Sequence, residues 1–210
     1  MISVPDRLVQ RAKDMSVRLS PAQTTQLSGY FDLLRRWNPR INLTSLPLDA
    51  LSPGEFDRLL FEPIAAADLL PKSAVTWFDL GSGGGSPAVP LKVMRPAMRL
   101  TMVEAKSRKC AFLREAARTV RLGDVVVLQA RIEELAASVP TGSADLLTVR
   151  AVRVDAGVHD ACAYLLAGSG RLAIFAGMEP PTIGGKALIL TSSLELRTYS
   201  SAWVHLYAKA

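Results

Sequence analysis

The chain of 210 residues has little of what builds disulfide frameworks and metal centres, since it contains two cysteines and two histidines. Cys110 and Cys162 lie far apart and belong to no C-x-x-C pair, and His159 and His205 are equally isolated. The sequence therefore indicates neither a disulfide nor a zinc site, and no metal is expected. Packing or surface positions are the simpler interpretation of all four residues.

Long apolar runs are also lacking, although 49% of the residues are apolar. No stretch of about 18 uninterrupted apolar residues occurs, which argues against a membrane-spanning helix. The start of the chain carries Asp6, Arg7 and Arg11 among its apolar residues, unlike a signal peptide. We therefore expect a soluble, cytoplasmic protein with no membrane partner.

The charge balance is basic, with a formal net charge of +6 and an isoelectric point of about 9.6. A basic protein suits a polyanionic partner, because neutralising phosphates releases condensed counterions. Arginine outnumbers lysine by 18 to 7, which favours bidentate phosphate contacts. An arginine-rich genome would produce the same ratio, so the charge alone does not establish nucleic-acid binding.

Two helix starts stand out in the first third of the chain. Ser20-Pro21-Ala22-Gln23 and Ser52-Pro53-Gly54-Glu55 each combine a capping serine, a proline at the first helical position and a residue that completes a capping box. Asn38-Pro39 is expected to end the first helix and Pro71 the second. We predict a helical N-terminal extension over residues 1–70.

From Val75 the pattern changes to short β-branched runs separated by helical stretches, which is typical of βαβ units. The expected strands cover residues 75–80, 100–104, 125–129, 145–149 and 171–175. Three more short strands without intervening helices are expected at 187–190, 194–199 and 203–207, so the sheet should finish with an antiparallel hairpin. Residues 71–210 are predicted to form one Rossmann-like α/β domain.

The segment Asp79-Leu80-Gly81-Ser82-Gly83-Gly84-Gly85-Ser86-Pro87 carries a buried strand directly into glycines, which allow a sharp turn and a close approach to a ligand. Glu104 closes the next strand, where an acid can accept hydrogen bonds from both hydroxyls of a ribose. Ser86 and Ala88 stand where a dinucleotide-binding G-x-G-x-x-G pattern needs glycine. The spacing therefore argues against a dinucleotide. Asp79-x-Gly81-x-Gly83-x-Gly85 instead resembles the first motif of class I methyltransferases, which implies S-adenosylmethionine, and a tight turn without a ligand is the alternative.

Four segments in the same order resemble one family. They are Trp37-Asn38-Pro39-Arg40-Ile41-Asn42-Leu43-Thr44, the glycine segment continued to Leu91, Ala130-Arg131-Ile132-Glu133, and Val149-Arg150-Ala151-Val152. The family is the bacterial small-subunit (16S) rRNA guanine-N7 methyltransferases, also called glucose-inhibited division protein B. This resemblance implies a class I S-adenosylmethionine-dependent methyltransferase fold, with a seven-stranded, mostly parallel sheet. It also implies S-adenosylhomocysteine as product, and ribosomal RNA or the small ribosomal subunit as partner.

The resemblance and the glycine segment together assign the site residues. Arg150 follows a buried strand on the side where open α/β sheets bind ligands, although a surface arginine is the alternative. We expect the cofactor to be bound by Asp79, Gly81, Ser82, Gly83, Gly85, Ser86, Glu104, Ile132, Glu133 and Arg150.

The residues expected to bind the methyl acceptor are one asparagine and a group of basic side chains. We expect Asn42 to face the methyl-acceptor pocket, with an alternative role in satisfying the backbone after Pro39. The basic residues that flank the motifs are expected to contact RNA: Arg35, Arg36, Arg40, Lys106, Arg108 and Lys109. No catalytic base or nucleophile is expected, because guanine N7 has a free lone pair and carries no proton.

The chain departs from the family pattern on the presumed acceptor side. Arg58-Leu59-Leu60-Phe61-Glu62-Pro63 replaces R-H-F-x-D-S, Ala176-Gly177 replaces a lysine-glycine pair, residues 178–186 are too few for the usual helix, and Ser201-Ala202 stands near a missing arginine-histidine pair. A non-catalytic or altered-substrate RNA- or partner-binding protein on a methyltransferase scaffold is therefore the alternative. A nicotinamide-dependent oxidoreductase is a weaker one, because Ser86 breaks its fingerprint.

Overall fold

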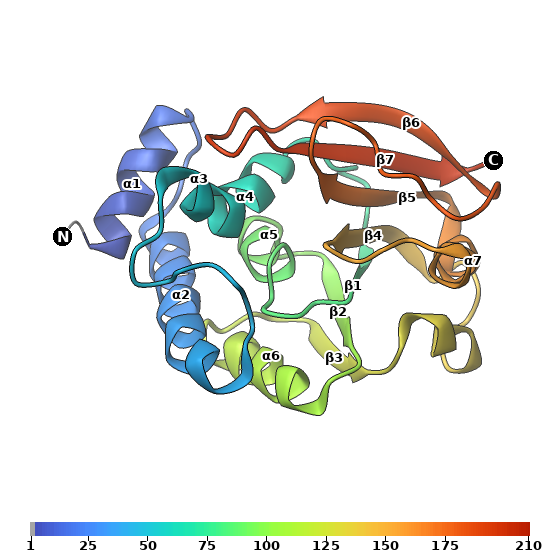
Figure 1. Cartoon of the computed structure of the whole chain (residues 1–210), viewed down its shortest axis with the longest axis horizontal. Helices are drawn as coiled ribbons and strands as arrows, with labels where there is room; N and C mark the ends of the chain where they lie inside the picture. The colour runs from blue at the N-terminus through green and yellow to red at the C-terminus, as the bar shows by residue number, and fades with distance from the viewer. Residues whose placement is uncertain (1–2) are drawn as a thin grey trace.

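A seven-stranded sheet forms the centre of the molecule in the computed structural model, which describes residues 3–210 (Figure 1). The spatial order is β3-β2-β1-β4-β5-β7-β6, and every pairing is parallel except those of β7 with β5 and β6. The strands are β1 (Thr76–Leu80), β2 (Arg99–Glu104), β3 (Val125–Gln129), β4 (Ala144–Arg150), β5 (Leu166–Ala176), β6 (Leu188–Glu195) and β7 (Trp203–Lys209). The predicted seven-stranded, mostly parallel α/β fold is thus confirmed.

The order of the strands reverses between β1 and β4, which pair directly although β2 and β3 come between them in the chain. Open α/β sheets bind ligands outside the carboxyl ends of their strands at such a switch point. The glycine segment follows β1 and Arg150 ends β4, so both lie at this edge.

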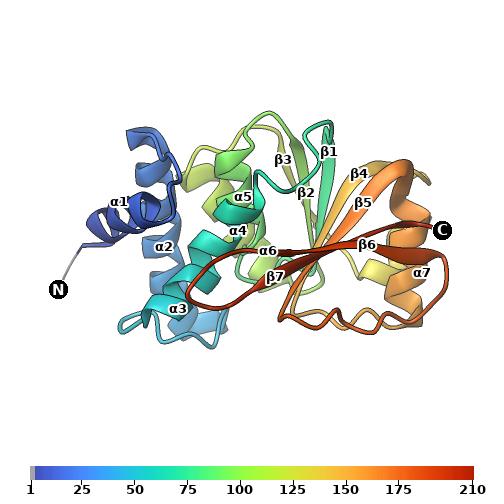
Figure 2. The ribbon, with the colours of Figure 1, turned by 90° about the horizontal axis from the view of Figure 1, so that it is seen from above.

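Helices cover both faces of the sheet (Figure 2). Alternate strand residues separate the two cores: Trp77 and Met102 pack with the helices of one face, whereas Phe78 and Val103 pack with those of the other. The first face carries α1 (Val4–Asp14), α2 (Pro21–Ile41), α3 (Pro53–Phe56), the π-helical η1 (Asp57–Phe61), α4 (Glu62–Ala66), α5 (Ala88–Met94) and α6 (Ser107–Thr119). The second carries the 3-10 helix η2 (Ile132–Ala137) and α7 (Ala156–Leu165).

Both predicted capping boxes are present. Ser20 and Gln23 exchange hydrogen bonds at the start of α2, and Ser52 and Glu55 do so at the start of α3. The helices of the extension bury their apolar faces in the same core as one face of the sheet, so they help to build the site rather than form a separate body.

Three predicted boundaries are wrong. Helix α2 continues through Pro39 to Ile41, because a proline in the last turn removes only one helical hydrogen bond. The second helical segment ends at Ala66, before Pro71. The last three expected strands are two, since β6 continues across polar Thr191-Ser192-Ser193 at the edge of the sheet, with an irregularity in its pairing to β7 between Leu190 and Ser192. Among residues 3–210, no helix is long and apolar enough to cross a membrane.

Candidate functional site

The glycine loop turns tightly at the carboxyl end of β1. Gly81 has a φ of +72°, and a Cβ atom there would lie 2.6 Å from Cγ2 of Val152. Gly85 has a φ of +88°, and its Cβ would press on Val89 and Tyr30. The backbone N–H groups of Gly81 and Ser82 both donate to the carbonyl of Val103, which fixes the turn against β2. A side chain at either glycine would collide with these neighbours and adopt an unfavourable positive φ.

A cavity of about 290 Å³ lies between the glycine loop and the N-terminal extension. The Tyr30 hydroxyl donates to the carbonyl of Gly84 at 2.7 Å, which fastens α2 to the loop. Residues 43–46 close the cavity from the other side, and a Cβ on Gly84 would lie 3.0 Å from the Leu43 carbonyl. Its remaining lining residues include Arg58, Leu59, Gly81, Ser82, Gly83, Ser86, Lys109, Arg150, Ala151 and Val152.

Asn38 shapes the segment that closes this cavity. Its side-chain oxygen accepts hydrogen bonds from the backbone N–H groups of Leu43 at 2.8 Å and Thr44 at 2.9 Å. Sequence reasoning considered that role for Asn42, whereas Asn42 is exposed and ends α2 in the left-handed conformation, with a φ of 48°. The W-N-x-x-I-N-L-T motif contains both asparagines, but the sequence does not indicate which of them binds the backbone of the following segment.

Glu104 lies directly behind the glycine loop. Its carboxylate accepts hydrogen bonds from the backbone N–H of Gly83 at 3.0 Å and of Lys106 at 2.8 Å. The loop thus folds back onto this carboxylate, so Glu104 supports the glycine loop as well as facing the site. Each carboxylate oxygen accepts more than one hydrogen bond, so acceptor capacity for two hydroxyls remains.

Asp79 is buried on the neighbouring strand with only part of its hydrogen-bonding capacity used. Trp77 Nε1 donates to the hydroxyl of Thr148 at 2.8 Å, and that hydroxyl donates to Asp79 Oδ1 at 2.5 Å. Asp79 Oδ2 has no partner among the described residues. Burial raises the pKa of Asp79 to about 6, against the lowering effect of the Thr148 hydrogen bond.

Arg150 lies at the centre of the site. Its guanidinium donates to Glu62 Oε2 at 2.6 Å, to the Arg58 carbonyl at 2.5 Å and to the Ser86 hydroxyl at 3.2 Å. It also lies over the Phe175 ring, 4.7 Å from the ring centroid. Burial lowers the pKa of Arg150, and the nearby Glu62 carboxylate opposes this shift. Arg150 is thus a largely covered, paired cation, with only 11% of its side chain exposed, and not a surface arginine.

A second cavity, of about 450 Å³, lies beyond Arg150 at the ends of β4 and β5. It shares Arg58, Arg150, Ala151 and Val152 with the first cavity, so the two are neighbours along one wall. Phe175 and Ile174 give it an apolar side, and Ser200-Ser201-Ala202, from the loop between β6 and β7, closes it.

The predicted cofactor residues fall into three groups. Gly81, Ser82, Gly83, Ser86 and Arg150 line the first cavity, and Asp79, Gly85 and Glu104 adjoin the loop without lining it. Ile132 and Glu133 lie apart, at the start of η2 beyond the carboxyl end of β3. Ile132 is partly buried in the second core, and Glu133 is exposed beside Gly157 of α7.

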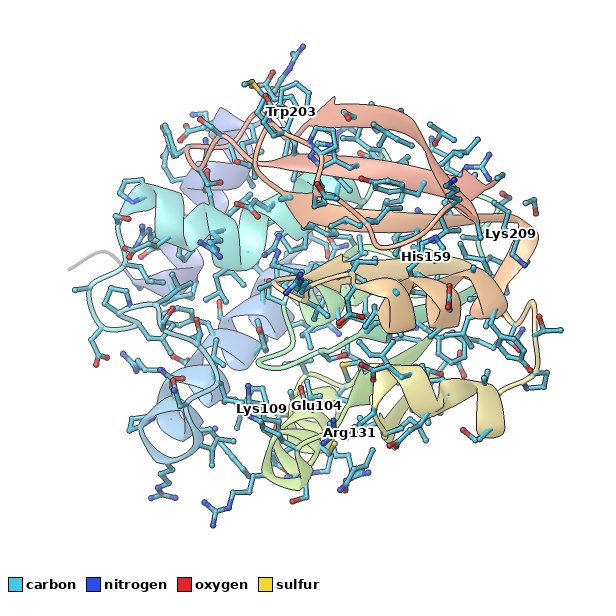
Figure 3. The ribbon with its side chains drawn as sticks, turned by 45° about the vertical axis from the view of Figure 1, so that its right-hand side comes forward. Glu104, Lys109, Arg131, His159, Trp203 and Lys209 are labelled. Atoms are coloured by element: carbon cyan, nitrogen blue, oxygen red, sulfur yellow. The ribbon has the colours of Figure 1, made fainter. Side chains whose placement is uncertain are left out.

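The basic residues also separate. Arg40 and Asn42 line a surface hollow with Lys106, Arg108 and Lys109, and Lys109 also borders the first cavity. Figure 3 shows Lys109 near Glu104, on the side of the molecule where α2 approaches α6. Arg35 instead lies near Asp32 and Asp49, at 3.6 and 4.0 Å. Arg36 is exposed on α2 and lies close enough to Glu115 of α6 to lower the pKa of that carboxyl, although the Arg118 hydrogen bond lowers it more.

The fold and the glycine-loop site define a class I S-adenosylmethionine-dependent methyltransferase. Mitomycin 7-O-methyltransferase has a similar fold, with a TM-score of 0.61 and 18% identity, covering 100% of this chain and 74% of that one. An S-adenosylmethionine-dependent methyltransferase from Aquifex aeolicus gives a TM-score of 0.54 and 12% identity, over 75% of this chain and 98% of that one. These likenesses show the fold alone.

Sequence comparison identifies the family within this class. The family model described as rRNA small subunit methyltransferase G matches residues 23–182. Ribosomal RNA small subunit methyltransferase G of Neisseria gonorrhoeae is 34% identical over 177 residues, which cover 83% of this chain and 81% of that protein. The protein of the same name from Roseiflexus sp. is 33% identical over 168 residues, covering 80% and 70%. The chain belongs to the rRNA small subunit methyltransferase G family, and its cofactor is S-adenosylmethionine.

The residues at the loop fit this cofactor. Gly81 and Gly83 line the cavity, a Cβ on Gly83 would meet no side chain, and Glu104 keeps acceptor capacity for ribose hydroxyls. Asp79 Oδ2 is a buried acceptor without a partner among residues 3–210, which suits a ligand carrying an amino group.

Proposed function

We propose that this protein transfers the methyl group of S-adenosylmethionine to N7 of a guanine in 16S ribosomal RNA. The observation that carries the proposal is the pair of neighbouring cavities that share Arg150 and Val152. The first holds the cofactor against the glycine loop, and the second receives the guanine at the ends of β4 and β5. The choice of acceptor is supported by the names of the family and of its relatives, which describe them as small-subunit rRNA methyltransferases.

The cofactor residues bind and orient. The backbone of Gly81 to Gly83 and the hydroxyl of Ser86 contact the methionine part, and Glu104 accepts hydrogen bonds from the ribose. Ile132 packs against the adenine, with Glu133 and the neighbouring backbone at its edge. Asp79 lies in β1 just before the glycine loop, and its Oδ2 accepts a hydrogen bond from the cofactor's amino group.

The chemistry asks little of the protein beyond alignment. The bound cofactor supplies a methyl group on a sulfonium, which transfers by displacement to a lone pair aligned opposite the sulfur. Guanine N7 carries such a lone pair and no proton, so no general base is needed and proximity accounts for most of the rate. The apolar side of the second cavity, with Phe175, provides a surface on which a base can stack.

The RNA backbone is bound next to the first cavity. Arg40, Lys106, Arg108 and Lys109 gather at one hollow, and Arg36 adds a charge on the same helix face as Arg40. Arg35 contributes less, because Asp32 and Asp49 lie beside it. Asn42, in the same hollow, contacts the acceptor RNA rather than the reacting base.

A methyl-transfer assay with radiolabelled cofactor tests the proposal. Purified protein should label small ribosomal subunits or naked 16S rRNA, with the label at guanine N7, and should not label small-molecule extracts. No labelling of any RNA, with intact cofactor binding, would favour the non-catalytic alternative.

Gel shifts test the RNA surface. The double variant Arg40→Ala, Arg108→Ala should weaken RNA binding by a similar factor for all sequences. It should also make the slope of log affinity against log salt concentration shallower, by the amount expected for the loss of roughly two phosphate contacts. Arg35→Ala is the matched control and should change both quantities much less. An unchanged salt dependence in the double variant would remove this hollow from the interface.

A further inference from the structure

The helical turn from Arg58 to Pro63, at the junction of η1 and α4, connects the N-terminal helices to the site, and it is one of the segments that depart from the family pattern. We infer that this turn is a positioning element, in which Glu62 and two backbone carbonyls hold Arg150 between the two cavities and Ser86 at the wall of the first. The inference rests on the proposed function, because it assigns the turn a role in cofactor binding.

The local sequence explains why carbonyls are available here. In η1 the hydrogen bonds span five residues, and the last runs from Glu62 N–H to the Asp57 carbonyl. Pro63 comes next and has no N–H, so it donates neither to Arg58, five residues back, nor to Leu59, four residues back. The Arg58 carbonyl instead accepts from Arg150, and the Leu59 carbonyl accepts from the Ser86 hydroxyl at 2.8 Å.

The carboxylate of Glu62 completes the arrangement. Its side chain is 6% exposed and that of Arg150 is 11% exposed, and their nearest N–O distance is 2.6 Å. A buried guanidinium needs an opposite charge in good geometry, and Glu62 supplies it from the same turn as the two carbonyls. With Phe175 packed against its face, the Arg150 guanidinium has one defined place between the cavities.

This turn therefore has a role in the site although it lacks the histidine and the serine of the family pattern. The histidine position holds Leu59, whose carbonyl binds Ser86, and the serine position holds Pro63, which leaves carbonyls free. Because backbone carbonyls bind Arg150 and Ser86, the pattern of side chains in this turn does not indicate the interaction.

The same segment carries a control. Asp57, in η1, is buried and forms a second ion pair, with the partly buried Arg11 of α1, at the same N–O distance of 2.6 Å, and neither residue lines either cavity. A substitution of Asp57 thus perturbs the packing of the segment as Glu62 substitutions do, but leaves Arg150 in place.

Isothermal titration with S-adenosylhomocysteine tests the inference, with circular dichroism to confirm folding at the measuring temperature. Glu62→Gln should weaken binding by roughly fivefold to thirtyfold, because the acceptor loses its charge. Pro63→Ala should weaken it by about threefold, because the restored N–H competes for the two carbonyls, while the melting temperature stays the same or rises. Asp57→Asn should change the affinity by less than about twofold, whatever its melting temperature.

A double-mutant cycle separates positioning from general damage. In an Arg150→Met background, Glu62→Gln should alter the affinity by less than about twofold, because its effect passes through Arg150. The inference is overturned if Glu62→Gln binds like the wild type, if its effect persists undiminished without Arg150, or if Asp57→Asn weakens binding equally. Absence of binding by the wild-type protein would instead overturn the proposed cofactor site, and this inference with it.

Discussion

The cofactor side and the acceptor side of the site are built in different ways. Around β1 and β2, short-range features place the groups: glycines with positive φ follow the strand, and Glu104 ends the adjacent one. Around β4, β5 and β7, the groups come from distant segments, with Arg150 held by Glu62 and the second cavity closed by residues 200–202. The cofactor side can therefore be predicted from the sequence. On the acceptor side the residues differ from the family pattern, but a cavity is still present.

The strongest test of this comparison removes the cation that joins the two sides. Arg150→Ala leaves Glu62 buried without its partner, and we expect the free energy of unfolding to fall by about 3–5 kcal/mol. Arg11→Ala, which leaves Asp57 to the Tyr199 N–H alone, should cost a similar or slightly smaller amount. Urea denaturation gives both values. A loss below 1 kcal/mol for Arg150→Ala would contradict the importance of this pair for the fold.

Glycine substitutions contrast the two sides directly. Gly81→Ala places a methyl group at positive φ and against Val152, so we expect a loss of about 2–4 kcal/mol and weaker cofactor binding. Gly177→Ala, beside the second cavity, meets nothing within 4 Å and should stay within about 0.5 kcal/mol of the wild type. Thermal melts of both variants make the comparison, and equal losses would show that the loop geometry is not the cause.

Asp79 gives the cofactor side a pH dependence. Its folded-state pKa of about 6 exceeds the ordinary 3.8, so the unfolded chain loses the proton first and stability falls as pH rises between these values. Relative to the wild type, Asp79→Asn should therefore gain up to about 3 kcal/mol between pH 4 and pH 6 and change little above that. Denaturation at a series of pH values measures the difference. A constant difference would mean that burial does not shift this carboxyl.

Glu104 tests cofactor recognition and the loop together. Charged hydrogen bonds contribute about 1.5–3 kcal/mol, so Glu104→Ala should weaken S-adenosylhomocysteine binding by roughly tenfold to more than a hundredfold, with Glu104→Gln in between. Because Gly83 and Lys106 also lose an acceptor, Glu104→Ala should be less stable than the wild type as well. Calorimetry on the folded variants decides, and wild-type affinity in Glu104→Ala would be incompatible with ribose binding.

The two asparagines of the W-N-x-x-I-N-L-T motif should have the smallest effects. Asn38→Ala leaves the N–H groups of Leu43 and Thr44 without their acceptor, at a cost of about 1–2 kcal/mol, and loosens the segment that closes the first cavity. Asn42→Ala should lower the melting temperature slightly, because alanine tolerates the positive φ of this position less well than asparagine, and should change cofactor affinity little while reducing turnover on RNA. Turnover and affinity measured side by side separate them, and a normal turnover for Asn42→Ala would exclude Asn42 from the acceptor side.

The sequence by itself determined the α/β fold, both capping boxes, the glycine loop and the place of Glu104 at the end of β2. These depend on local periodicity, on glycine conformations and on caps, which neighbouring residues specify. It misjudged the end of α2 and divided β6, because a proline in a last turn and a polar sheet edge cost less than their residue types suggest. The position of Ile132 and Glu133 relative to the cofactor stays a prediction.

Only the tertiary structure decided which groups meet across long sequence distances. It assigned the inward role to Asn38, paired Glu62 with Arg150, and showed that the loop already occupies part of the Glu104 carboxylate. It also separated Arg35 from the hollow that contains Arg40, Lys106 and Lys109, although Arg35 and Arg40 both lie in α2. The physical reason is that buried polar groups must find partners wherever the packed chain brings them, and residue order alone does not specify that packing.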